Sequence, residues 1–135
     1  MNKILVGTDT TASADLAVAG AAELARARGA ELLVLYVRSD GDLHAAVDPS
    51  KAASPEAYLD ALGRRFPGVT THTRLADGDP AALICEVAAQ EQVDTIVVGN
   101  RGAHGSWWRV RDSVANLVLR HSPCSVYVVD TRRAQ

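Results

Sequence analysis

The sequence predicts an α/β fold: a five-stranded parallel sheet in an open, doubly wound sandwich. Short apolar runs alternate with longer, alanine-rich segments along the whole chain, in the order βαβαβαβαβ. The second run is continuously apolar, which is typical of a strand covered on both faces. Parallel neighbours need crossover connections, and the intervening helical segments supply them. With 135 residues, we expect a single domain over residues 1–135.

The first half of the chain shows this alternation clearly. Ile4–Val6 is a β-branched strand that Gly7 closes, and Ala12–Arg28 has apolar residues at helical spacing until Gly29 ends the helix. Glu31–Val37 is the continuously apolar second strand. Residues 39–54 contain Gly, Pro and several Asp, so we expect a polar loop there.

The second half repeats the pattern. Proline suits the first turn of a helix, and Pro55, Asp79-Pro80 and Ser122-Pro123 mark boundaries between elements. The helices predicted here are Pro55–Arg65, Pro80–Gln90 and Ser113–His121, and the strands are Val69–Leu75, Asp94–Val98 and Cys124–Val129.

Composition excludes several classes of function. The net charge is only −2 and no long block of like charge occurs, so we expect neither a nucleic-acid partner nor an anionic membrane partner. The chain shows no basic leader with a cleavage site and no apolar run of roughly 18 residues, which predicts a cytoplasmic protein. Cys85 and Cys124 form no CxxC motif and are expected to pack structurally. The histidines have no ligand-like spacing, so no metal site is predicted from them.

The candidate binding residues follow the strands. In open parallel sheets, ligands bind beyond the carboxyl ends of strands, where the winding direction reverses. Thr8 and Asp9 follow the first strand, and Val37 ends the second. After the fourth strand, Gly99 and Gly102 allow positive φ, so that backbone amides can converge on phosphate oxygens. We call the loop from Gly99 to Gly102 the phosphate cradle.

Further residues could assist this cradle. Arg101 could pair with phosphate charge through its forked donors. Asp112 and Ser113 open the next helix, whose free amide groups would face the same anion. Both tryptophans, Trp107 and Trp108, lie between the cradle and this helix. We interpret them as packing or interface residues rather than a base-stacking platform.

These residues resemble the universal stress protein family. The stretch from Gly99-Asn100-Arg101-Gly102 to Ser113 is similar to the family pattern Gly-x2-Gly-x9-Gly-Ser/Thr. The opening Ile4–Asp9 and the phrase Gly78-Asp79-Pro80 are similar as well, and the likeness covers essentially the whole chain. It implies the adenine-nucleotide alpha hydrolase-like fold with strand order 3-2-1-4-5.

The resemblance also implies a ligand and a partner. In nucleotide-binding members, Asp9 and Val37 would hold the adenosine of ATP, and Gly99, Gly102 and Ser113 would hold phosphates, with or without Mg2+. The family implies a homodimer through the last strand, Cys124–Val129. That strand is uncharged before Asp130, and an unpaired apolar edge invites a second copy. Tyr127 and Val129 are the expected interface residues.

One residue departs from the family pattern: Asp112 stands where the third glycine is expected. As an N-cap, Asp112 would occupy the amide donors that phosphate needs and would repel phosphate charge. As a Mg2+ ligand, it would instead support binding. A third possibility is that Asp112 turns outward and leaves binding unchanged.

The chain lacks a recognisable catalytic apparatus, since neither a P-loop nor a Gly-x-Ser-x-Gly elbow occurs. The first functional hypothesis is an ATP-binding regulatory protein of the stress response, with at most slow ATP hydrolysis. The alternative is a nucleotide-independent interaction module in which Asp112 disables the cradle. A third hypothesis is an enzyme that acts on a nucleotide or another phosphorylated small molecule.

Overall fold

The computed structural model describes residues 2–9, 12–38, 55–99 and 114–131. These residues form a five-stranded sheet with the order β3-β2-β1-β4-β5, and all four neighbouring pairs are parallel. The predicted fold class and strand order are therefore confirmed. The described helices include none that is both long enough and apolar enough to cross a membrane.

The elements follow the predicted alternation closely. The strands are β1 (Lys3–Thr8), β2 (Glu31–Arg38), β3 (Thr71–Asp77), β4 (Thr95–Gly99) and β5 (Ser125–Val129). The helices are α1 (Ala12–Arg28), α3 (Pro55–Arg65), α4 (Pro80–Gln90) and α5 (Val114–His121).

Strand β3 lies two residues later than the pattern Val69–Leu75 predicts. Val69 is buried in the core ahead of the strand, and pairing with β2 begins at Thr71, opposite Leu32. Pairing continues to Asp77, opposite Arg38. The hydrogen bonds of the neighbouring strand, rather than local alternation, decide where this edge strand begins and ends.

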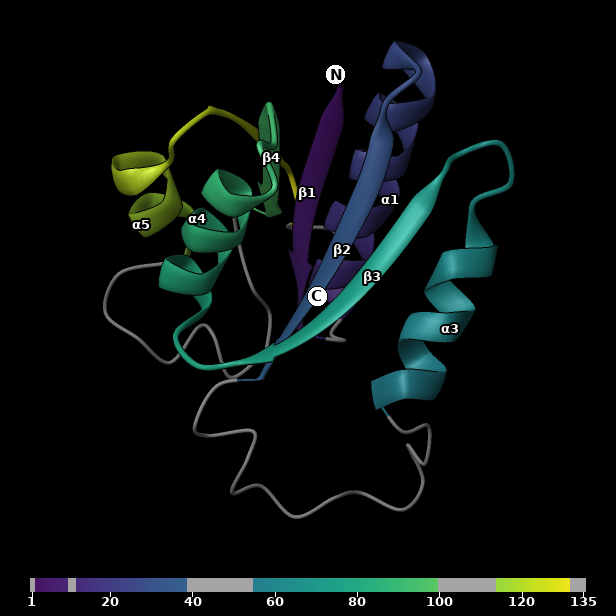
Figure 1. The fold of residues 1–135 in the computed structure, drawn as a ribbon, viewed down its shortest axis with the longest axis horizontal. Helices are drawn as coiled ribbons and strands as arrows, with labels where there is room; N and C mark the ends of the chain where they lie inside the picture. The colour runs from purple at the N-terminus through teal and green to yellow at the C-terminus, as the bar shows by residue number, and fades with distance from the viewer. Residues whose placement is uncertain (1, 10–11, 39–54, 100–113, 132–135) are drawn as a thin grey trace.

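Two helical layers cover the sheet, as Figure 1 shows: α4 and α5 lie together on one side, and α1 and α3 lie on the other. Alternate residues of β1 serve the two layers, with Leu5 in the α4/α5 core and Ile4 and Val6 in the α1/α3 core. Small residues let α1 approach the sheet closely. A Cβ atom on Gly20 would lie 2.9 Å from Cγ2 of Val129.

The start of α4 agrees with the prediction from Asp79-Pro80. The Asp79 carboxylate accepts a hydrogen bond of 2.9 Å from the Ala82 amide, and Pro80 occupies the first helical turn. This is the usual way in which a short acidic side chain satisfies a free amide at a helix start.

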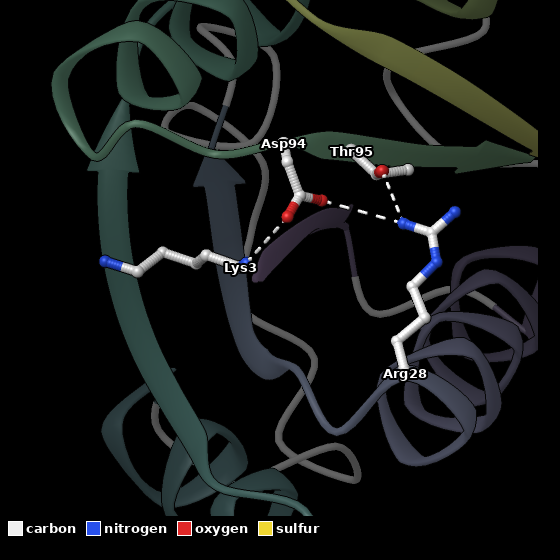
Figure 2. A network of polar contacts seen from close by, with 4 residues as sticks. All are labelled: Lys3, Arg28, Asp94 and Thr95. Carbon is white, nitrogen blue, oxygen red and sulfur yellow. Dashed lines mark hydrogen bonds and ion pairs between the residues drawn. The ribbon is translucent and has the colours of Figure 1, made fainter. Parts of the chain in front are cut away.

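At the amino edge of the sheet, a polar network joins β1, α1 and β4 (Figure 2). The Lys3 amide donates to Oδ2 of Asp94 at 3.2 Å, and the Asp94 amide donates to the Lys3 carbonyl at 3.0 Å. Nη1 of Arg28 lies 3.6 Å from Oδ1 of Asp94 and donates to Oγ1 of Thr95 at 2.9 Å. Asp94 was predicted to begin the fourth strand; it instead precedes β4 and links it to β1.

Candidate functional site at the carboxyl edge of the sheet

The register brings the predicted residues of three strands to one edge of the sheet. Thr8 pairs with Tyr36, so the next residues, Asp9 and Val37, continue side by side. Val6 pairs with Val97 at the end of the ladder between β1 and β4, and Thr8 and Gly99 each follow two residues later. The order β3-β2-β1-β4-β5 reverses its winding between β1 and β4, where ligands bind in open sheets.

Half of the predicted site residues can be located in this way. Thr8, Asp9, Val37 and Gly99 belong to the part of the chain that the structure describes. The other four predicted residues lie outside the described residues, and their roles stay predictions: Arg101, Gly102, Asp112 and Ser113.

The structure explains the glycine at residue 99 differently from the sequence analysis. Its φ is not among the positive values found in the described chain, so the expectation of a positive φ is wrong at this residue. A Cβ atom on Gly99 would instead lie 2.8 Å from Cγ2 and 3.2 Å from Oγ1 of Thr131, a buried residue. Glycine allows this close approach between the end of β4 and the chain that follows β5.

Val37 is fully buried, and its side chain packs in the α4/α5 core. The isopropyl group therefore holds the end of β2 against that layer. No part of Val37 is exposed, so its predicted contact with adenosine stays a prediction.

Thr8 is also fully buried, but its side chain faces the opposite layer. Its hydroxyl lies 3.1 Å from the hydroxyl of Tyr58 in α3. Thr8 was predicted to contact the ligand; its hydroxyl is engaged with another protein group, and the predicted contact stays untested.

Tyr58 connects three elements beneath the site. Its hydroxyl donates a hydrogen bond of 3.1 Å to Oδ1 of Asp15 in α1, and Nη1 of Arg65 lies 4.0 Å from the same oxygen. Its ring meets the Tyr36 ring edge-on, with centroids 5.7 Å apart and planes at 76°. Burial raises the pKa of Tyr58; the hydrogen bond to Thr8 opposes this shift, and the negative charge of Asp15 adds to it.

Sequence reasoning missed Tyr58 and Asp15 as neighbours of the site. One signal was available: Tyr58 and Leu62 share a face of the predicted helix, and a tyrosine on a buried face needs a partner for its hydroxyl. The identity of that partner could not be read from the sequence, because Thr8 is 50 residues away.

Next to β3, an ion pair joins the ends of β2 and β3 at this edge. Nε and Nη2 of Arg38 donate to the two carboxylate oxygens of Asp77 at 2.7 and 3.1 Å. The Gly78 amide donates to the Arg38 carbonyl at 2.9 Å, with a φ of 144° at Gly78. The ends of β2 and β3 are thus tied together next to Val37.

The two cysteines lie away from this edge network. Both are partly buried against the α4/α5 core, and burial, followed by the neighbouring Cys124, raises the pKa of the Cys85 thiol. A raised pKa reduces thiolate reactivity. The described residues include no group of three side chains suited to hold a metal ion.

Comparisons with known proteins are consistent with this geometry. The model of the universal stress protein family matches residues 1–130. Universal stress protein Slr1101 from Synechocystis sp. is 44% identical over 54 residues, which cover 40% of this chain and 50% of that protein. Universal stress protein YxiE from Bacillus subtilis is 28% identical over 145 residues, which cover 95% of this chain and 98% of that protein.

A solved structure is also similar along nearly its whole length. It is a crystal structure of a universal stress protein in complex with cAMP, 28% identical, with a TM-score of 0.71; the match covers 96% of this chain and 97% of that one. The chain thus spans about half the length of Slr1101 but nearly all of YxiE and of the cAMP complex.

Proposed function

The chain belongs to the universal stress protein family, and from this premise we propose that it binds an adenine nucleotide at the carboxyl edge of its sheet. The observation that carries the proposal is that β2, β1 and β4 are parallel neighbours, so that Val37, Asp9 and Gly99 lie at the same edge of the sheet. The similar universal stress protein crystallised with cAMP supports an adenine ligand. We further propose a regulatory role in the stress response, without efficient catalysis.

ATP is the nucleotide that we propose, with Asp9 and Val37 at the adenosine. The Asp9 carboxylate can accept hydrogen bonds from ribose hydroxyls. Val37 is fully buried, so the base edge would reach its main chain only after the covering residues move. Gly99, Arg101, Gly102 and Ser113 would hold the phosphates.

Calorimetric titration with ATP, ADP and AMP, each with and without Mg2+, tests this proposal. We expect saturable binding at or below millimolar concentrations, with the adenine ring required, so GTP serves as the control ligand. Fluorescence of Trp107 and Trp108 offers an independent readout near the cradle in sequence. A flat response to millimolar adenine nucleotides in both measurements would refute the proposal.

The alternative function, a nucleotide-independent interaction module, depends on Asp112. Two like charges about 4 Å apart cost roughly 1 kcal/mol in water and about 4 kcal/mol at an effective dielectric of 20. If Asp112 repels phosphate, Asp112→Gly should strengthen ATP binding by several-fold to about a thousandfold. If Asp112 holds Mg2+ instead, the same change should weaken binding, and only when Mg2+ is present. Equal affinity in both proteins would indicate that Asp112 turns outward.

We also propose a homodimer through β5. Tyr127 is 49% exposed, Val128 42% and Leu119 of α5 53%, which makes them the exposed large hydrophobic residues of the described chain. Val129, expected at the interface, instead packs partly against the α1/α3 core. Tyr127 and Val128 are therefore the interface residues that we propose on β5.

Light scattering at micromolar concentration tests this assembly. We expect a dimer for the unchanged chain and a monomer for Val128→Lys, because a charge would be buried in the interface. Thr73→Lys places the same charge on an exposed position of the other edge strand, β3, and should leave the dimer intact. A monomer in the unchanged chain would end the proposal.

Cytoplasmic location and a single domain over residues 1–135 also remain proposals.

A further inference from the structure

Tyr58 contacts the two residues that immediately precede the proposed adenosine contacts. Thr8 precedes Asp9, and Tyr36 precedes Val37. Thr8 and Tyr36 are register partners on neighbouring strands, and Tyr58 reaches both from α3: its hydroxyl lies 3.1 Å from the Thr8 hydroxyl, and its ring packs edge-on against the Tyr36 ring. One side chain thus supports the ends of β1 and β2 together.

The hydrogen bonds at Tyr58 have a definite direction. A tyrosine hydroxyl has one proton, and an ionised carboxylate can only accept. Because the Tyr58 hydroxyl donates to Oδ1 of Asp15, it can only accept from Thr8. The Thr8 hydroxyl must therefore donate toward α3, which selects one rotamer of a β-branched side chain.

This arrangement restrains the chain at the start of the loop after β1. Thr8 is fully buried, so its hydroxyl cannot exchange Tyr58 for bulk water without local opening. When the side chain of a β-branched residue is restricted to one rotamer, the backbone of that residue is restricted as well. Asp9 is the next residue, so the orientation of the Asp9 side chain at the carboxyl edge depends on the backbone of Thr8.

We propose that Tyr58 is a positioning residue for the nucleotide site: its hydroxyl, oriented by Asp15, fixes Thr8 and thereby aims Asp9. The identity of the ligand rests on the proposed function, whereas the hydrogen-bond relay through Thr8, Tyr58 and Asp15 does not. The relay makes the affinity for nucleotide sensitive to α1 and α3, which carry Asp15 and Tyr58.

Four variants test the relay. Tyr58→Phe removes the hydroxyl but keeps the ring against Tyr36, and Thr8→Val removes the donor with little change of shape. Asp15→Ala removes the acceptor, whereas Asp15→Asn keeps a carbonyl acceptor and loses only the charge. Thr73→Val is the matched control, because it removes the hydroxyl of an exposed threonine on β3.

Affinity for ATP with Mg2+ is the first measurement. We expect Tyr58→Phe, Thr8→Val and Asp15→Ala each to weaken binding about threefold to tenfold, the usual net contribution of one hydrogen bond. The Tyr58→Phe/Thr8→Val double variant should be no weaker than either single variant, because both remove the same interaction. Asp15→Asn should rescue most of the affinity that Asp15→Ala loses.

Hydrogen exchange without nucleotide is the second measurement, and it does not depend on the ligand. Tyr58→Phe, Thr8→Val and Asp15→Ala should accelerate amide exchange in peptides covering residues 3–9. Peptides covering residues 31–38 should change less in Tyr58→Phe, because the ring still packs against Tyr36. Asp15→Asn and Thr73→Val should leave exchange in residues 3–9 near that of the unchanged chain.

The two measurements separate failure of the relay from failure of the proposed function. If the unchanged chain binds no adenine nucleotide, the proposed function fails, and exchange in residues 3–9 still decides the relay. If ATP binds equally well to the unchanged chain and Tyr58→Phe, the positioning role is wrong although the function stands. Equal exchange in residues 3–9 for Tyr58→Phe and Thr73→Val would overturn the relay itself. Should Tyr58→Phe fail to fold, the Asp15→Ala and Asp15→Asn pair gives the same comparison.

Discussion

The two edges of the sheet use their polar side chains differently. At the amino edge, Asp94 binds the Lys3 amide and Arg28, so strand ends and a helix end are joined to one another (Figure 2). At the carboxyl edge, the buried hydroxyl of Thr8 contacts the Tyr58 hydroxyl. Asp9 follows β1 and Gly99 ends β4, where the winding reverses. One edge holds the fold together, and the other supports a candidate binding site.

This difference shows how the same residue type serves two purposes. Asp94 and Asp9 are both aspartates beside a buried strand, yet Asp94 links β1, α1 and β4. Asp9 stands at the end where parallel sheets bind ligands. Removing the Asp94 carboxylate should therefore change mainly the stability of the fold, and removing the Asp9 carboxylate should change mainly the affinity for nucleotide.

The largest expected effect is on nucleotide binding. Asp9→Ala should weaken ATP binding about 10- to 100-fold, because hydrogen bonds to a charged group are worth about 1.5–3 kcal/mol. Calorimetry measures the affinity, and urea unfolding without nucleotide should show a much smaller change. Unchanged affinity would remove Asp9 from the proposed site.

The amino edge should show the opposite behaviour. Asp94→Ala leaves the Lys3 amide without its acceptor and removes the ion pair with Arg28, which keeps its hydrogen bond to Thr95. It should lower the free energy of unfolding by about 1–3 kcal/mol. Urea unfolding measures this loss, and ATP affinity should stay the same. Asp60→Ala breaks only an exposed pair with Arg64 and should cost less than about 1 kcal/mol. Equal losses in the two variants would contradict the role given to Asp94.

Gly99 tests how tightly the carboxyl edge is packed. Gly99→Ala puts a Cβ atom 2.8 Å from Thr131 and should cost about 1–3 kcal/mol of unfolding free energy, as overpacking usually does. Thr131→Ala should relieve the collision, so the double variant should lose less than the sum of the single changes. Gly63→Ala is the control in α3, where nothing lies within 4 Å of the new atom, and should stabilise by roughly 0.5–1 kcal/mol.

The smallest expected effect is on the pH dependence of stability. Burial raises the pKa of Tyr58 above the ordinary value of 10.0, so the folded protein holds this proton more tightly than the unfolded chain. The resulting stability is present below pH 10 and is lost as the pH rises above that value. Compared with the unchanged chain, Tyr58→Phe should make urea midpoints fall less steeply above about pH 10. The same slope in Tyr58→Phe and in the unchanged chain would argue against a buried Tyr58 hydroxyl.

Much of the architecture could be predicted from local signals. Apolar runs and alanine-rich segments locate all nine described elements, and the bounds of α1 and of α4 after Asp79 agree with the structure. The shift of β3 and the separation of Asp94 from β4 could not be predicted, because hydrogen bonds to β1 and β2 decide them. Such bonds join residues far apart in the chain, and alternation within one segment carries no record of them.

The sequence predicted where the candidate site residues lie better than it predicted why each residue type occurs there. Asp9, Val37 and Gly99 were expected at strand ends, and the register brings those ends together. The reason for glycine at residue 99 was wrong, since Thr131, rather than a positive φ, excludes a side chain there. The residues beneath the site, Tyr58 and Asp15, were not expected at all.

The sequence by itself determined the alternating elements, the strand ends that carry the candidate residues and the family resemblance, because these are short-range patterns of apolar, proline and glycine residues. Only the tertiary structure decided which side chains meet. Thr8, Tyr58 and Asp15 come from β1, α3 and α1, and Gly99 meets Thr131 across the end of β5. Packing between elements creates these contacts, and a linear pattern of residue types does not specify the distance between two atoms in different layers.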